Sequence, residues 1–103
     1  MEKKTSEINK LKTQIRAAVE KYLDLNKYRV FIFGSRAAHK GDSRSDIDVG
    51  IFGKRPVPIS VMAHLREELE SIPTLLKIEV VDFSRVSEKF KIVAMKHVEF
   101  ITK

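Results

Sequence analysis

The stretch VFIFGSRAAHKGDSRSDIDVGIF, residues 30–52, decides the fold. It begins with four apolar residues, breaks at Gly34-Ser35, and becomes apolar again after a polar and basic interval. Two carboxylates, Asp46 and Asp48, stand inside the second apolar segment, although aspartate is a poor strand former. The pattern therefore predicts two strands joined by a loop, with acidic residues retained for a purpose other than folding.

The second apolar segment alternates in a way that separates core from site. Ile47, Val49 and Ile51 would point to one face of a strand, whereas Asp46 and Asp48 would point to the other with Gly50. Two carboxylates this close repel each other, and the repulsion raises the pKa of one of them. A cation between them removes this cost, and Mg²⁺ favours a few carboxylates together with water and substrate phosphates.

A third carboxylate would complete a site for two metal ions, and the segment 76–83 offers two candidates. Glu79 and Asp82 are three residues apart, so a regular strand directs them to opposite faces. Ile78 and Val80 have the character of core residues, which places Glu79 on the face of the aspartate pair. Glu79 is the preferred third carboxylate, and Asp82, at the end of the strand, remains the alternative.

Gly34-Ser35 predicts an anion site at the end of the first strand. A glycine directly after a buried strand permits a tight turn and a close approach of ligand to backbone. If Ser35 begins a helical turn, its hydroxyl and free backbone N–H groups would bind a phosphate. Arg36 adds positive charge, so a nucleoside triphosphate would fit beside metal ions held by Asp46 and Asp48.

The remaining periodicity predicts a compact α/β domain with a small mixed sheet, formed as one domain by residues 1–103. Ser6 is the expected N-cap of the first helix. In the third expected helix, 84–96, the side chains expected to point inward are those of Val86, Phe90, Val93 and Ala94. The expected helices are 6–25, 60–71 and 84–96, and the expected strands are 29–33, 45–52, 76–83 and, briefly, 98–101. Residues 35–45 are expected to form a loop, with one helical turn at 36–39.

Composition restricts the classes of function that are possible but does not identify one of them. The formal net charge is +6 with 33% charged residues, which predicts attraction to polyanions such as nucleotides, nucleic acid or an acidic protein. There is no cysteine, so disulfides and thiolate metal sites are excluded. Neither a signal peptide nor an apolar run of membrane-spanning length is present, which predicts a cytoplasmic protein.

Gly34-Ser35, ten residues, then Asp46-Ile47-Asp48 resembles the Gly-Ser-x10-Asp-x-Asp pattern of nucleotidyltransferases related to DNA polymerase β. With FGSRA, SDIDVGIF and IEVVDFSRVS, nearly the whole chain resembles the minimal nucleotidyltransferases (MNT). The resemblance implies a small mixed β-sheet packed on one side by helices, the polymerase β-like palm fold. In that family the first acid of the third strand is the third metal ligand. That position is Glu79 here, where aspartate is more usual.

The resemblance also implies a mechanism and a partner. Asp46, Asp48 and Glu79 would hold two Mg²⁺ ions, while Ser35 and the Gly34 backbone would bind the β- and γ-phosphates of ATP. Minimal nucleotidyltransferases are commonly encoded beside a HEPN-domain toxin, and some transfer AMP to one of its tyrosines. This chain would then be an antitoxin. Two alternatives are a non-catalytic module that neutralises a HEPN partner by binding it and, less favoured, nucleotidyl transfer to RNA.

Overall fold

The computed structural model describes residues 2–34 and 46–102. Within them the elements are α1 (Glu2–Glu20), β1 (Tyr28–Phe33), β2 (Ile47–Gly53), α2 (Ile59–Glu70), β3 (Ile78–Asp82), α3 (Glu88–Ala94) and β4 (Glu99–Phe100). The strands form one sheet in the order β3-β2-β1-β4. β1 is antiparallel to β2 and β4, whereas β2 and β3 are parallel, so the predicted mixed sheet is confirmed.

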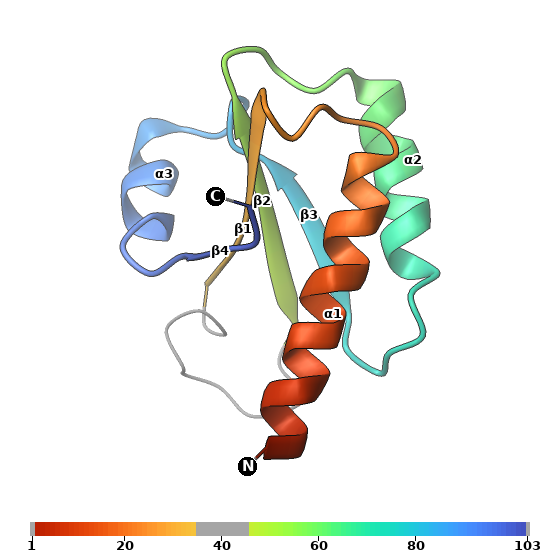
Figure 1. Cartoon of the computed structure of the whole chain (residues 1–103). Coiled ribbons are helices and arrows are strands. Elements are labelled where there is room, and N and C mark those ends of the chain that lie inside the picture. Colours follow the sequence, from red (N-terminus) through yellow and green to blue (C-terminus); the bar gives the residue numbers. More distant parts are fainter. Residues whose placement is uncertain (1, 35–45, 103) are drawn as a thin grey trace.

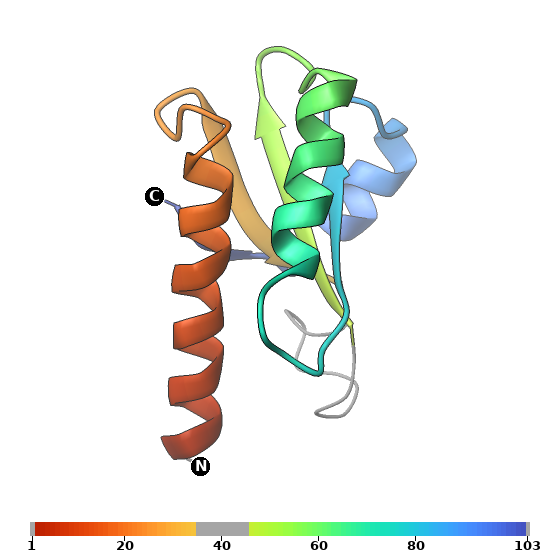
Figure 2. The same ribbon diagram turned by 90° about the vertical axis from the view of Figure 1, so that its right-hand side faces the viewer.

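The two long helices cover one face of the sheet (Figures 1 and 2). α2 is the crossover that makes β2 and β3 parallel, as such a connection requires. The large hydrophobic core lies between these helices and the sheet. Most of its members come from α1, α2 and three strands, and they include Leu11, Ile15, Val19, Val30, Ile32, Ile47, Val49, Ile51, Met62, Leu65, Leu69, Ile78 and Val80.

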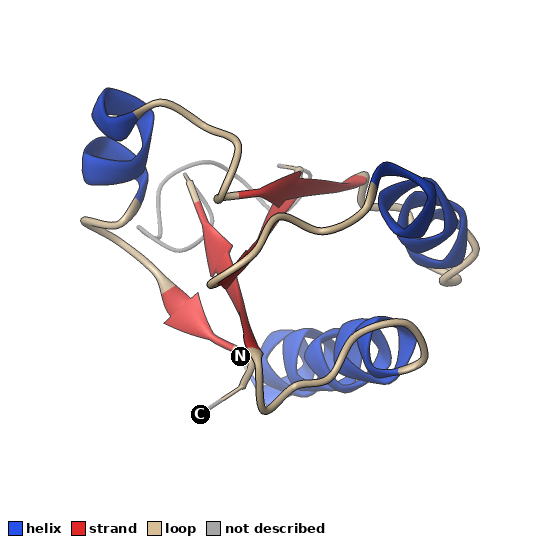
Figure 3. Cartoon of the chain, turned by 90° about the horizontal axis from the view of Figure 1, so that it is seen from above, coloured by secondary structure: helices blue, strands red, loops and turns tan. Residues whose placement is uncertain are grey.

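The opposite face of the sheet carries a smaller aromatic core under α3 (Figure 3). The rings of Phe31, Phe33 and Phe83 are buried there and meet edge to face, with centroids 4.9 Å apart for Phe31–Phe83 and for Phe33–Phe83. Gly50 makes room for this cluster, since a Cβ at that position would lie 2.3 Å from the Phe31 ring. Helices therefore lie on both faces, two long ones on one side and a short one on the other.

Three local expectations are wrong at the helix ends. Ser6 is not an N-cap, because α1 already begins at Glu2, and the helix ends at Glu20 rather than at residue 25. α3 begins at Glu88, not at residue 84, because Ser87 caps it by accepting a hydrogen bond from Phe90 N at 3.1 Å.

The expected inward face of α3 is also only partly correct. Val86 and Ala94 pack against the aromatic core, and the Phe90 ring also meets it although Phe90 is 42% exposed, but Val93 is 65% exposed. The expectation failed because α3 spans only seven residues and covers only part of the sheet face beneath it. Apolar residues of this helix therefore remain at the surface.

Candidate active site

β2 separates the core from the candidate site, as its alternation predicts. Ile47, Val49 and Ile51 are fully buried beneath the long helices. Asp48 is half-buried on the opposite face, and Asp46 is exposed directly before the strand. Both carboxylates therefore lie at the beginning of β2, on the side of the sheet that α3 covers only in part.

Gly34 lies against Asp48 at the end of β1. Antiparallel pairing places Phe33 opposite Asp48, so Gly34 follows directly. Its φ is +82°, a conformation that only glycine adopts readily. A Cβ at this position would lie 2.6 Å from Asp48 Oδ2. Gly34 thus serves two needs, the turn out of β1 and the space that the Asp48 carboxylate occupies.

Glu79 is the neighbour of Asp48 across the parallel pairing of β2 and β3. Ile78 and Val80 are buried, whereas Glu79 is exposed on the other face. Its Oε1 lies 3.2 Å from Lys77 Nζ in an ion pair at the surface. The sheet register thus brings Glu79 beside the aspartate pair, with its carboxylate bound to a lysine.

Lys77 is a member of the site that the sequence analysis did not consider. It precedes Glu79 by two residues, so period-two reasoning places both on one face of an extended segment. The hydrogen bond from Lys77 to Glu79 raises the pKa of the ammonium, and the charges of Glu79 and Asp46 raise it further. Lys77 is thus a cation that already balances part of the negative charge of this site.

The electrostatics around Asp48 favour a cation. Burial raises the pKa of Asp48, and the negative charges of Glu79 and Asp46 raise it further. The ionised form is therefore disfavoured until positive charge arrives. The donor set is made of carboxylate oxygens, which suit a hard divalent ion such as Mg²⁺. The residues present fit the metal that the aspartate pattern implies.

The three carboxylates nevertheless form no preassembled cage. Among the described residues, no three His, Asp or Glu side chains are close enough together to hold one metal ion. Glu79 is instead engaged by Lys77. Metal binding by all three would require Glu79 to exchange its lysine partner for the ion.

Asp82 has a different environment from Glu79. Its side chain is 3% exposed and accepts hydrogen bonds from Val57 N at 2.7 Å and Ser84 N at 2.9 Å. Arg85 Nε lies 3.3 Å from the same carboxylate and donates through Nη2 to the Val57 carbonyl at 3.1 Å. These contacts connect β3 to the segment before α2, so the Asp82 carboxylate has a structural role.

The phosphate-binding expectations for Ser35 and Arg36 concern residues outside the described ranges. The same is true of the helical turn expected at 36–39. Of the residues expected to bind phosphate, Gly34 is therefore the one that the structure describes. It also describes the carboxylates of Asp46, Asp48 and Glu79.

A scan against models of protein families provides the decisive comparison. Residues 3–103 match the model described as "Polymerase beta, Nucleotidyltransferase". The chain belongs to the polymerase β nucleotidyltransferase family. A search of curated proteins finds no match.

Solved structures with the same fold as this nucleotidyltransferase include toxin–antitoxin assemblies. One is a toxin–antitoxin with AMP-PNP, at TM-score 0.71 and 16% identity, covering 87% of this chain and 71% of the other. Another is a tri-AMPylated Shewanella oneidensis HEPN toxin in complex with MNT antitoxin, at TM-score 0.67 and 16% identity, covering 92% and 70%. A third is an MntA-HpeT mutant with two aspartates changed to glutamate, at TM-score 0.70 and 14% identity, covering 87% and 71%.

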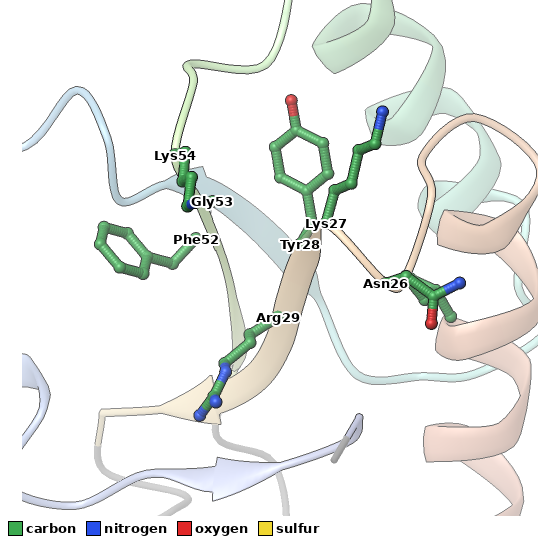
Figure 4. Close-up of a pocket in the computed structure, with 8 residues that line it drawn as sticks. Asn26, Lys27, Tyr28, Arg29, Phe52, Gly53 and Lys54 are labelled. Atoms are coloured by element: carbon green, nitrogen blue, oxygen red, sulfur yellow. The ribbon is translucent and has the colours of Figure 1, made fainter.

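A surface cavity of about 380 Å³ lies at the other end of β1 and β2 from the carboxylates of this nucleotidyltransferase (Figure 4). Three cations, Lys27, Arg29 and Lys54, line it with Tyr28 and Phe52, and no carboxylate does. It is therefore distinct from the candidate active site.

No helix in residues 2–34 and 46–102 has the length and apolar character needed to cross a membrane.

Proposed function

We propose that this nucleotidyltransferase moves AMP from ATP, with Mg²⁺, to a hydroxyl of a macromolecular acceptor. The acceptor we propose is a tyrosine of a HEPN-domain toxin, which would make the chain an antitoxin. One observation carries the proposal: Asp48 lies beside Gly34 and Glu79, in a chain whose family transfers nucleotides. Support for the acceptor comes from the structural neighbours, one of which contains an AMPylated HEPN toxin.

Each residue has a separate task in this proposal. Asp46, Asp48 and Glu79 would hold the metal ions, and the Gly34 backbone with Ser35 and Arg36 would bind the phosphates. Bound metal would stabilise charge on the entering and leaving oxygens. The acceptor oxygen would attack the α-phosphorus in line, the bond to the bridging oxygen would break, and pyrophosphate would leave. Glu79 would receive the proton of the attacking hydroxyl.

Nucleotidyl transfer depends on the positioning of the reacting groups more than on covalent catalysis. Asp48 is fixed by pairing with β1 on one side and β3 on the other. Lys77 would be released when Glu79 turns to the metal, and its ammonium would then be free to face the negative charge of the triphosphate.

The experiment compares the wild type with an Asp46→Asn/Asp48→Asn variant in the presence of labelled ATP, Mg²⁺ and the HEPN-domain protein of the neighbouring gene. Loss of metal ligands removes several kcal/mol of transition-state stabilisation. We therefore expect label transfer to fall by about a hundredfold or more. Glu67→Gln, at an exposed position of α2, is the matched control and should transfer normally. Absence of label on a partner that binds the wild type would reject the adenylyl-transfer proposal.

A second candidate, neutralisation by binding alone, is favoured by the Glu79–Lys77 ion pair, which engages one of the three proposed metal ligands. The same double variant separates the two functions. Adenylyl transfer predicts that the variant binds the toxin without neutralising it. Full neutralisation by the variant would instead establish the binding module.

A further inference from the structure

Exposed apolar side chains gather on and around α3. Of the nine large hydrophobic residues exposed in the described part of the chain, six lie on α3, directly after it, or on the sheet face that it overlies. Their exposed fractions range from 38% to 65%. These six define the α3 patch: Phe52, Phe90, Ile92, Val93, Met95 and Phe100. Monomeric proteins rarely leave such groups together at the surface unless they bind something there.

The packing of α3 explains why these side chains remain exposed. Phe90 meets the rings of Phe33 and Phe83 at centroid distances of 6.0 and 5.7 Å, so one side of the helix is anchored to the aromatic core. Ile92 and Val93 are 62% and 65% exposed and therefore turn away from it. A helix of seven residues thus has one apolar side in the fold and another that no described residue covers.

Positive charge accompanies the patch. The Arg29 guanidinium lies 5.8 Å from the Phe100 ring centroid, and Lys91 Nζ lies 5.2 Å from that of Phe52. The cavity lined by cations adjoins the patch, because Phe52 belongs to both, and Arg29 of the cavity lies against Phe100 of the patch. Figure 4 shows these two side chains on the side of the strands away from the long helices. One acidic group, Glu88, lies 3.4 Å from Lys91.

This chemistry favours a protein over a nucleic acid. Ile92 and Val93 offer no stacking surface for bases, whereas aliphatic, aromatic and arginine side chains are typical of the buried centre of protein interfaces. The cations beside the patch, which include Arg29 and Lys91, would pair with carboxylates on the partner, by charge complementarity. The occupant is therefore a protein surface with an apolar centre flanked by acidic residues.

The patch shares a sheet face with the candidate active site. Arg29 pairs with Phe52, and Phe33 pairs with Asp48, so Phe52 and Asp48 are four residues apart on the same face of β2. At the usual rise of a strand they are separated by about 13 Å. A protein seated on the α3 patch would therefore lie within reach of the carboxylates.

We propose that the α3 patch is the docking surface for the acceptor protein, and that it binds an apolar region of that protein flanked by carboxylates. The inference rests on the proposed function, since it assigns a surface to the partner of the same site. Docking there would place an acceptor hydroxyl near Asp48.

The test measures the dissociation constant of the complex with the HEPN-domain protein of the neighbouring gene by titration calorimetry. Ile92→Glu should raise it about thirtyfold or more, as for a central interface residue. Ile59→Glu is the matched control, because Ile59 is 73% exposed on α2 and lies outside the patch. Arg29→Glu should also weaken binding, whereas Arg66→Glu, at an exposed position of α2, should not. Thermal melts verify that each variant is folded.

The outcomes separate the docking surface from the chemistry. Tight binding that Ile92→Glu and Arg29→Glu leave unchanged would overturn the docking surface, whatever happens to AMP transfer. Selective weakening without any transfer by the wild type would support the surface and overturn adenylyl transfer. If a single-stranded RNA of 20 nucleotides binds through Arg29 while the HEPN-domain protein fails to bind, the docking proposal is wrong.

Discussion

The carboxylate of Asp48 occupies the space that a side chain at position 34 would need, with Oδ2 only 2.6 Å from the ideal Cβ position of Gly34. No side chain at position 34 therefore separates the end of β1 from the Asp48 carboxylate. This contact links the proposed phosphate end of the site to the proposed metal end.

Gly34→Ala should impair both folding and function. The left-handed φ of +82° costs a residue with a Cβ about 1–2 kcal/mol, so we expect the free energy of unfolding to fall by about that amount. The new methyl group would also push the Asp48 carboxylate away, so transfer should fall more than the fraction of folded protein does. Urea denaturation and labelled-ATP transfer measure the two effects. Undiminished transfer per folded molecule would show that the contact has no catalytic importance.

Asp48→Asn should stabilise the metal-free protein at neutral pH. The pKa of Asp48 is raised in the folded state, so folding favours its protonated form. Its favourable contribution is complete below the ordinary value of 3.8 and is lost as the pH rises through the folded-state pKa. The ionised wild type therefore carries a penalty at pH 7 that asparagine avoids.

Thermal denaturation in EDTA should show a higher melting temperature for Asp48→Asn than for the wild type at pH 7. The difference should shrink as the pH falls through the folded-state pKa and below the ordinary value of 3.8. Adding Mg²⁺ at pH 7 should stabilise the wild type and not the variant, because a ligand that binds only the folded state stabilises it. A variant that is less stable than the wild type at pH 7 without metal would contradict the reasoning.

Glu79 and Asp82 should respond oppositely to substitution. Glu79→Gln alters an exposed side chain, so stability should change by no more than about 0.5 kcal/mol while transfer is lost. Asp82→Ala leaves the buried Val57 N–H without its acceptor, which should cost about 1–3 kcal/mol. Thermal melts together with transfer assays separate the two. Full activity of Glu79→Gln would exclude it as the third metal ligand.

Gly50→Ala should destabilise the aromatic core without changing any carboxylate. The added Cβ would lie 2.3 Å from the Phe31 ring and 2.8 Å from that of Phe83, and overpacking of this kind costs about 1–3 kcal/mol. Because the clash is with the Phe31 ring, Phe31→Leu should reduce the cost of Gly50→Ala. A double-mutant cycle measured by urea denaturation tests this coupling. Strictly additive effects would show that the backbone, not the ring, resists the substitution.

The features that could be predicted from the sequence depend on a strictly local rule. The alternation of Ile47, Asp48 and Val49 is set by the geometry of a single strand, and the same geometry placed Glu79 opposite the core residues Ile78 and Val80. The parallel register that makes Asp48 and Glu79 neighbours required only a crossover helix of ordinary length. The catalytic roles assigned to Asp48 and Glu79 rest on the same pattern, and they stay predictions.

The features that could not be predicted depend on distant partners. Asp82 is fixed by Val57, 25 residues earlier, and nothing near Asp82 in the sequence signals that hydrogen bond. The exposed side of α3 was missed because periodicity identifies apolar residues without saying whether the fold covers them. Ser87 did carry a local signal, since an N-cap serine precedes the observed helix, but the apolar pattern extended further and favoured an earlier start.

The division of β2 into a buried and an acidic face also limits how its gene can change. Removing or inserting one codon between Ile47 and Ile51 would exchange the two faces, driving carboxylates into the interior and aliphatic side chains into the site. Replacement of individual side chains would be far less harmful than any change of length. In a deletion scan, this strand should therefore be among the least tolerant segments of the chain, and length variation should be confined to the segments between strands.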